Sequence, residues 1–185
     1  MSKQRTPTWS QVKARLVSLD EKELIKIVGE MYKLNADSKI FLTSRLGLAV
    51  AEPQIEPYRR AICREFNPER GLPKLNVSVA RKALNAFRKA CTEPAVVADL
   101  MLYYVEQGVA CTLQYGDIDA GFYSSLESAF VEAIQVIRQT GDVEIIEQFR
   151  PRLEEIMTDT QGIGWGFHDY LEEVYYNEYP QDASN

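Results

Sequence analysis

Residues that commonly build reactive sites or metal sites are scarce in this sequence. It has one histidine and three cysteines, and Cys63, Cys91 and Cys111 are far apart and form no Cys-x-x-Cys pair. An odd, scattered set of thiols excludes a disulfide framework and a thiolate zinc site. We therefore expect free thiols that pack as small hydrophobic side chains in a reducing compartment.

Long apolar segments are also absent. The longest near-apolar run, residues 95–105, has 11 residues and is interrupted by Asp99, whereas a membrane-spanning helix needs about 20. The N-terminal stretch MSKQRTPTWSQVK has no apolar centre of the kind found in secretion signals. We expect no membrane association and a cytoplasmic protein.

Signals for β-strands are missing, and signals for helices recur in their place. No segment alternates apolar and polar residues over the length of a strand, and no Asn-Gly or Asp-Gly turn separates two β-branched runs. A first short helix follows a cap at Thr8 or Ser10, and Asp20 caps a second helix. In that second helix the apolar residues have the three- and four-residue spacing of an amphipathic stripe: Leu24, Ile27, Val28, Met31 and Leu34.

Capping residues, glycines and prolines place the later helices. We expect helices at 39–47 after Asp37 or Ser38, through 58–66 near Pro53 or Pro57, at 79–91 after Ser78, at 95–116 after Pro94, through 125–140, at 143–160 after Asp142, and at 164–179. Pro151 should kink or divide its helix. Eight or nine helices with short loops predict an all-α fold, a single compact domain over 1–185 built from antiparallel helical hairpins, with a disordered tail at about 180–185.

Charge is distributed very unevenly along the chain. Residues 1–90 contain 18 Lys or Arg and 9 Asp or Glu, a net charge of +9, whereas residues 91–185 contain 3 and 18, a net charge of −15. Eight of the ten tyrosines also lie in the acidic half. The basic residues concentrate between 59 and 89, and the ones that we expect to bind a partner are Arg59, Arg60, Arg64, Arg81, Lys82, Arg88 and Lys89.

The predicted helix at 79–91 separates its apolar residues from its charges. Its apolar face consists of Ala80, Leu84, Phe87 and Cys91, and its cationic face consists of Arg81, Lys82, Arg88 and Lys89. Such a face is typical of a solvated surface, or of one that the acidic half of the same chain neutralises. Phosphates are an alternative partner, although no helix-turn-helix, RNP motif or basic arm accompanies the helix.

Asp117 and Asp119 resemble a site because they flank a single residue beside hydroxyl and aromatic side chains. A calcium loop that starts at Asp117 would need glycine at its sixth position and glutamate at its twelfth, where this chain has Phe122 and Ser128. We expect instead that Gly116 ends one helix and that Asp117 or Asp119 caps the next. A metal site that recruits both aspartates stays open as an alternative.

The segment QGIGWGFHDYLEE (161–173) holds the single histidine. Its glycines do not follow the dinucleotide-binding pattern, and no strand precedes them. His168, Asp169 and Glu172 are candidates for proton transfer or metal binding, because His168 and Glu172 are one helical turn apart. A structural hydrogen bond for His168, with glycines that allow close packing, is the simpler interpretation.

Three segments carry a resemblance to a known family. They are YVEQGVACTLQYGDIDAGFYSSLES (104–128), FNPERGLPKLNVSVARKALNAF (66–87) and GIGWGFHDYLEE (162–173). They resemble segments of a bacterial family of small proteins classed as a domain of unknown function, in the same order and over nearly the whole chain. The resemblance implies a cytoplasmic, all-helical bacterial protein, and it implies no activity or catalytic residues.

Three hypotheses for function follow from these observations. The first is a non-enzymatic adaptor that uses its basic face (about 59–89) and its acidic, tyrosine-rich half (91–185) to bind another protein or a second copy of itself, without a cofactor. The second is a nucleic-acid-binding protein that acts through the basic helix at 78–91. The third is a metal- or histidine-dependent enzyme that uses Asp117, Asp119 and His168, and it requires that these residues converge in one cleft.

Overall fold

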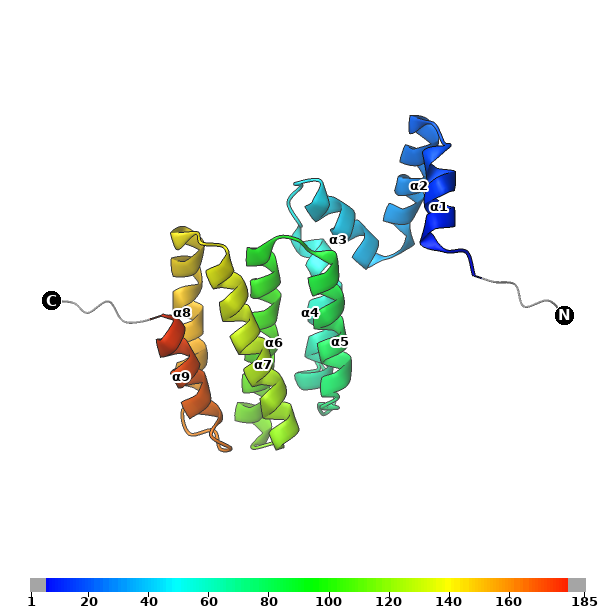
Figure 1. Ribbon diagram of the computed structural model, residues 1–185. Helices are drawn as coiled ribbons and strands as arrows, with labels where there is room; N and C mark the ends of the chain where they lie inside the picture. The colour runs from blue at the N-terminus through cyan, green and yellow to red at the C-terminus, as the bar shows by residue number, and fades with distance from the viewer. Residues whose placement is uncertain (1–5, 180–185) are drawn as a thin grey trace.

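A computed structural model describes residues 6–179, which form nine α-helices (Figure 1). Their bounds are α1 (Trp9–Val17), α2 (Glu21–Leu34), α3 (Ala36–Arg45), α4 (Glu52–Phe66), α5 (Val77–Ala90), α6 (Pro94–Tyr115), α7 (Ala120–Gln139), α8 (Val143–Asp159) and α9 (Phe167–Glu178). The prediction of a single all-α domain of eight or nine helices is confirmed. The predicted disordered tail at about 180–185 lies outside the described residues.

Side-chain caps fix most of the helix starts. Thr8, Asp20 and Asp142 cap α1, α2 and α8 as predicted, each by accepting a backbone N–H of the first turn. Two predicted caps are wrong, because asparagines upstream take that position. Asn35 accepts from the N–H of Ser38 and Asn76 accepts from the N–H of Val79, so α3 and α5 begin earlier than the sequence suggested.

The prolines interrupt the helices less than expected. Pro57 lies inside α4, and α8 continues past Pro151 without being divided. A proline removes one backbone hydrogen bond. Phe149 and Leu153 on either side of Pro151 are both buried in the core, so tertiary packing holds the two halves of α8 in one helix.

The core forms around α6, which pairs with α7 along most of its length (Figure 1). Leu100, Met101 and Tyr104 of α6 are fully buried. The ring of Phe66 lies edge-on to the rings of Tyr104 and Phe122 at 5.2 and 5.3 Å, which joins α4, α6 and α7. The hairpins α4–α5, α6–α7 and α8–α9 therefore share one interior.

Within residues 6–179, α6 is the one helix that is long and apolar enough to cross a membrane by length and composition alone. In the fold 61% of its most apolar window is buried against the other helices. This is the position of a core helix, and it explains why the longest apolar run of the sequence occurs here.

The hairpin of α1 and α2 stands away from this interior and meets it through α3 (Figure 1). Neither helix contains a buried residue. Of the predicted apolar stripe on α2, Leu24 and Ile27 are half-buried, whereas Met31 is exposed. The spacing of the stripe predicts an amphipathic helix, and α2 is a helix, but its stripe does not face the common core.

Candidate functional site

Asp117 and Asp119 have separate structural tasks. Asp119 caps α7, where its Oδ1 accepts the N–H of Phe122 at 2.9 Å. Asp117 Oδ1 accepts the hydroxyl of Tyr123 at 3.1 Å. The other oxygen of Asp117 lies so close to Gly164 that a Cβ there would approach it to 2.9 Å. Gly164 thus allows the α8–α9 loop to pack against this carboxylate.

The carboxylates near Asp117 do not assemble into a metal-binding group. In the part of the chain that the structure describes, no cluster of three or more histidine, cysteine, aspartate or glutamate side chains could hold an ion. The two aspartates point to different partners, since one serves a helix start and the other a tyrosine hydroxyl. The predicted helix cap is therefore Asp119, and Asp117 instead binds the tyrosine hydroxyl.

His168 is tied to the end of α8. Thr160 is fully buried and donates its hydroxyl hydrogen to the carbonyl of Met157 at 2.8 Å. Its oxygen lies 3.0 Å from Nδ1 of His168, so it can accept a hydrogen bond from an N–H at that nitrogen. His168 therefore takes the structural hydrogen bond that the simpler interpretation predicted.

A hollow of about 290 Å³ between α8 and α9 contains His168 and Glu172. Two of its other polar groups pair with each other, since the hydroxyl of Tyr175 donates to Glu154 at 2.8 Å. Burial, together with this carboxylate, raises the pKa of Tyr175 to about 12. The hollow excludes Asp169, which is exposed, and it also excludes both Asp117 and Asp119. The structure does not bring the predicted catalytic set into one cleft.

Two basic residues of α5 are paired with the acidic half of the chain. Arg81 and Arg88 each donate to a different oxygen of Glu132 on α7. Arg81 also reaches the hydroxyl of Ser128 at 3.4 Å. Half of the predicted cationic face is therefore paired within the molecule, where it joins α5 to α7.

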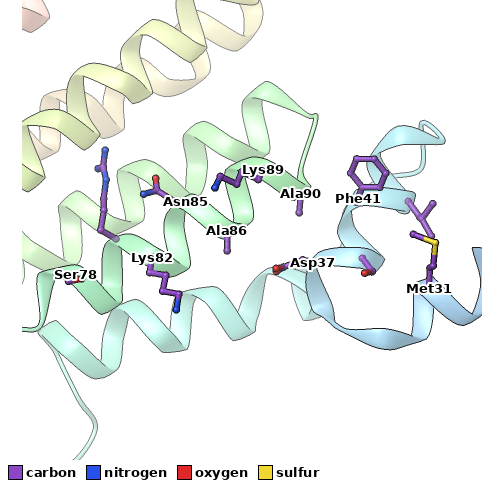
Figure 2. Close-up of a pocket in the computed structure, with 12 residues that line it drawn as sticks. Met31, Asp37, Phe41, Ser78, Lys82, Asn85, Ala86, Lys89 and Ala90 are labelled. Carbon is purple, nitrogen blue, oxygen red and sulfur yellow. The ribbon is translucent and has the colours of Figure 1, made fainter. Parts of the chain in front are cut away.

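The other two basic residues of α5, Lys82 and Lys89, are exposed and form no ion pair within residues 6–179. They border a groove of about 830 Å³ between α5 and the α2–α3 corner. Figure 2 shows Lys82, Ala86 and Lys89 along α5, with Phe41 of α3 and Met31 of α2 on the other side. The apolar part of the groove is formed by Met31, Phe41, Leu42, Ala86 and Ala90.

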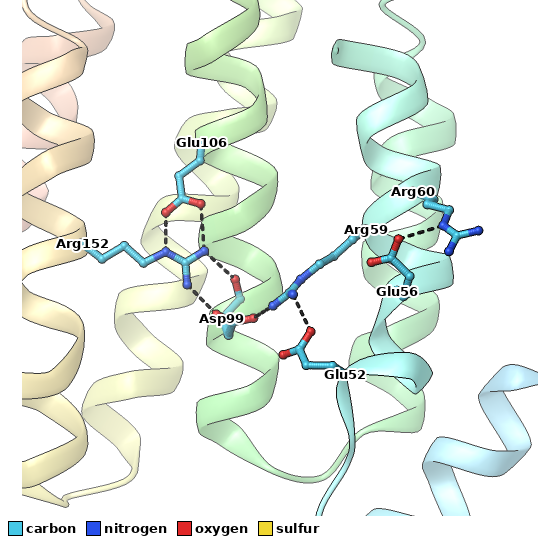
Figure 3. Close-up of polar contacts among 7 residues, drawn as sticks. All are labelled: Glu52, Glu56, Arg59, Arg60, Asp99, Glu106 and Arg152. Atoms are coloured by element: carbon cyan, nitrogen blue, oxygen red, sulfur yellow. Dashed lines mark hydrogen bonds and ion pairs between the residues drawn. The ribbon is translucent and has the colours of Figure 1, made fainter. Parts of the chain in front are cut away.

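The basic residues of α4 likewise include some that are paired with carboxylates and one that is not. Arg59 donates to Glu52 and to Asp99, both at 2.6 Å, and Arg152 of α8 donates to the other oxygen of Asp99 at 2.6 Å (Figure 3). Asp99 of α6 thereby joins α4 to α8. Figure 3 also shows Arg60, paired on the surface with Glu56 at 2.8 Å, while Arg64 is exposed with no ion pair among the described residues.

With this geometry described, comparison with known proteins identifies the family. Residues 8–178 match a family described as "Family of unknown function (DUF6155)". The chain belongs to DUF6155. The match extends from the cap of α1 to the last residue of α9, so the family comprises the whole nine-helix fold. No curated protein and no solved structure matches the chain. The resemblance to a family of unknown function is confirmed.

The groove beside α5 in this DUF6155 chain was only partly visible in the sequence. Lys82 and Lys89 were predicted as binding residues, but Met31 was named only as part of an apolar stripe and Phe41 was not singled out. The sequence contained one indication of this site. The apolar stripe on α2 lies in a short segment, and few other apolar helices are near it along the chain. Its exposure depends on the angle between α2 and α3, which no local pattern specifies.

Proposed function

We propose that this DUF6155 protein is a non-enzymatic interaction module that binds an acidic, amphipathic helical segment of a partner protein. The binding site is the groove between α5 and the α2–α3 corner. One observation carries the proposal: the groove combines an apolar floor with two exposed lysines that no carboxylate of residues 6–179 neutralises.

The floor of the groove has the apolar surface that binds an amphipathic helix. Met31 and Phe41 are 47% and 41% exposed, a large apolar area for side chains that lie in a concave surface. Amphipathic helices bind such grooves through apolar residues at positions i, i+3, i+4 and i+7. Methionine adapts its shape to different apolar partners. The small Ala86 and Ala90 on α5 allow a second helix to approach closely.

The edge of the groove selects for negative charge. Lys82 and Lys89 are seven residues apart on α5, so they lie on the same side of the helix with a rise of about 10 Å between them. Arg81 also lines the groove, but Glu132 already binds its guanidinium. A partner helix with carboxylates two turns apart would match the two free ammonium groups.

Nucleic acid fits this site less well. A phosphate backbone offers no apolar surface to bury against Met31 and Phe41. Asp37 also lines the groove, where its carboxylate accepts the hydroxyl of Tyr58 and adds a negative charge. The mixture of apolar floor, one carboxylate and two lysines favours a peptide.

The test uses two synthetic helical peptides of about 18 residues, a length of about 27 Å. Both carry leucines at i, i+3, i+4 and i+7, and they differ in having glutamates or lysines seven residues apart. Fluorescence anisotropy should show that the glutamate peptide binds and the lysine peptide does not. Binding should weaken between about 50 mM and about 500 mM salt, because the lysines are exposed.

The decisive variant is Lys82→Glu/Lys89→Glu, which should reduce binding of the glutamate peptide by about tenfold or more. Lys22→Glu/Lys26→Glu on α2 makes the same charge change outside the groove and should bind as the natural protein does. Equal affinity of the groove variant and its control would contradict the proposal. Labelled RNA or DNA that binds while the glutamate peptide does not would favour the nucleic-acid hypothesis.

A further inference from the structure

The α1–α2 hairpin has an apolar surface that the rest of the molecule does not cover. Each of its large apolar side chains in the following set is 40% exposed or more: Trp9, Val12, Val17, Ile25, Val28, Met31, Tyr32 and Leu34. The body of the protein shows no comparable density, since nearly all large apolar residues of α6 and α7 are buried. An apolar patch of this extent marks an interaction surface.

The hairpin also has a cavity of its own. A groove of about 900 Å³ runs along α1, and its apolar lining includes Val12, Leu16, Leu19 and Ile27. Leu16, Leu19 and Ile27 are half-buried and line this groove, which places Ile27 of α2 beside α1. On α2, a Cβ added at Gly29 would meet nothing within 4 Å, which leaves space for another helix.

Two short helices cannot form a stable core by themselves. Helices of 9 and 14 residues are marginal in isolation, and most helical stability in proteins comes from packing an apolar face. Antiparallel hairpins are commonly completed as four-helix bundles, in which the apolar faces of two hairpins meet. The α1–α2 hairpin supplies half of such a bundle.

We propose that two copies of the protein associate through their α1–α2 hairpins, which pack face to face about a twofold axis into a four-helix bundle. A twofold contact is self-complementary, because the same patch is used on both copies. The protein is then a dimer whose two bodies, each with its own peptide groove, lie at opposite sides of the bundle. Met31 is the one side chain of this patch that also lines that groove, and the inference does not depend on it.

Charge favours a second copy as the occupant. Residues 6–34 contain five Lys or Arg and four Asp or Glu, a net charge of +1. Two such hairpins can approach without strong repulsion, whereas the halves of the whole chain differ widely in charge. Nothing on the hairpin selects a partner of strongly acidic or basic character.

The exposed apolar area of the α1–α2 hairpin is also of the size that a specific dimer interface buries. A specific interface buries roughly 1,200–2,000 Å² in total, or about 600–1,000 Å² from each copy. An aromatic side chain contributes about 150–250 Å² when it is fully buried, and Trp9 and Tyr32 are 68% and 42% exposed. Together with the six aliphatic and methionine side chains, the hairpin supplies an area of this size.

Light scattering after gel filtration tests the proposal with the full chain. At protein concentrations up to about 100 µM, the molecular mass should be twice the 21.1 kDa of the chain. The dimer should persist in high salt, because an apolar contact is not screened. This separates it from the peptide groove, whose binding should weaken with salt, and Lys82→Glu/Lys89→Glu should leave the dimer intact.

Two variants place charge in the predicted contact: Trp9→Glu/Val12→Glu on α1 and Val28→Glu on α2. Both should give the monomer mass, while circular dichroism shows that the body remains helical, because none of these side chains lies in the main core. The matched control is Leu72→Glu/Val143→Glu, whose side chains are 78% and 70% exposed elsewhere, and it should stay dimeric.

Three outcomes would overturn the inference. One is a natural protein that is monomeric at every concentration. Another is a dimer that survives both hairpin variants, which would place the contact elsewhere. The third is a mass that grows without limit as concentration rises, because a head-to-tail contact and not a twofold one produces open chains.

Discussion

Single carboxylates decide how the basic first half of the chain meets the acidic second half. Asp99 accepts from Arg59 and Arg152, and Glu132 accepts from Arg81 and Arg88. Each carboxylate has less than a third of its side chain exposed. Loss of Glu132 would leave Arg81 and Arg88 without an ion-pair partner among the described residues. Loss of Asp99 would remove one of two carboxylates from each of its arginines, since Arg59 keeps Glu52 and Arg152 keeps Glu106.

Asp99→Asn should therefore destabilise the fold by about 2 kcal/mol, because two partly buried arginines lose one negatively charged acceptor. Urea unfolding followed by circular dichroism measures the change. Glu56→Gln is the matched control, since Glu56 pairs with one exposed arginine on the surface, and it should leave the unfolding midpoint unchanged. Equal effects of the two substitutions would show that the Asp99 network does not stabilise the fold.

Two tyrosines, the buried Tyr175 and the partly buried Tyr103, make stability depend on alkaline pH. Burial raises the pKa of Tyr103 and of Tyr175 from 10.0 to about 12. The folded state then holds these protons at a pH at which the unfolded chain releases them. The contribution of these two tyrosines to the free energy of unfolding is fully present below about pH 10 and is lost as the pH rises through 12.

Thermal unfolding between pH 9 and 12 should show this decline. The variants Tyr103→Phe and Tyr175→Phe each lack one phenol whose pKa is raised in the folded state. Each variant should therefore lose less stability over the same pH interval than the natural protein does. An identical pH profile for all three proteins would show that the two hydroxyls do not cause the decline.

At the scale of the element, caps and close contacts set where helices begin and how near they lie. Asp119 shows that a carboxylate which looks like a ligand can be the start of a helix. Gly108 shows how α6 and α7 come so close, because a Cβ there would lie 2.4 Å from Cδ2 of the fully buried Leu126. Glycine within α6 is a packing requirement at this position.

Gly108→Ala should destabilise the protein by about 1–2 kcal/mol, because the overpacking of a tight core outweighs the helix propensity that alanine adds. Gly29→Ala in α2 is the matched control, since nothing lies within 4 Å of the added Cβ. It should stabilise the protein by about 0.5–1 kcal/mol. Denaturant unfolding of both variants checks the two signs, and a stabilising Gly108→Ala would contradict the close contact.

At the scale of the whole molecule, the fold has a core of paired helices and a hairpin outside it. The hairpins from α4 to α9 share one interior, whereas α1 and α2 contain no buried residue (Figure 1). Regions with few buried apolar contacts open more readily than core helices do. The stability of α1 and α2 should therefore depend on what covers them.

Hydrogen exchange should show this difference directly. In dilute protein the amides of α1 and α2 should exchange much faster than those of α6 and α7, because their helices lack core packing. At higher concentration the hairpin amides should exchange more slowly if a second copy covers them, while α6 and α7 stay unchanged. Equal protection of the hairpin and the core in dilute protein would contradict this view of the fold.

Local patterns predicted a large part of this structure. The caps at Thr8, Asp20 and Asp142 are local hydrogen bonds, so a short stretch of sequence contains everything that specifies them. The apolar face of α5 is buried as its spacing predicted. Pro151 was predicted to kink or divide its helix, and α8 is not divided there. Burial of the residues on either side keeps the helix continuous, and a local pattern does not contain that information.

The sequence by itself determined the helices, the all-α class and the separation of charge, because periodicity and capping act over a few residues. Only the tertiary structure decided which charges are free: Arg81 and Arg88 meet Glu132 from far along the chain, whereas Lys82 and Lys89 face a groove. It also decided that the stripe on α2 stays exposed. Both depend on the angles between helices, and those angles follow from the packing of the whole chain.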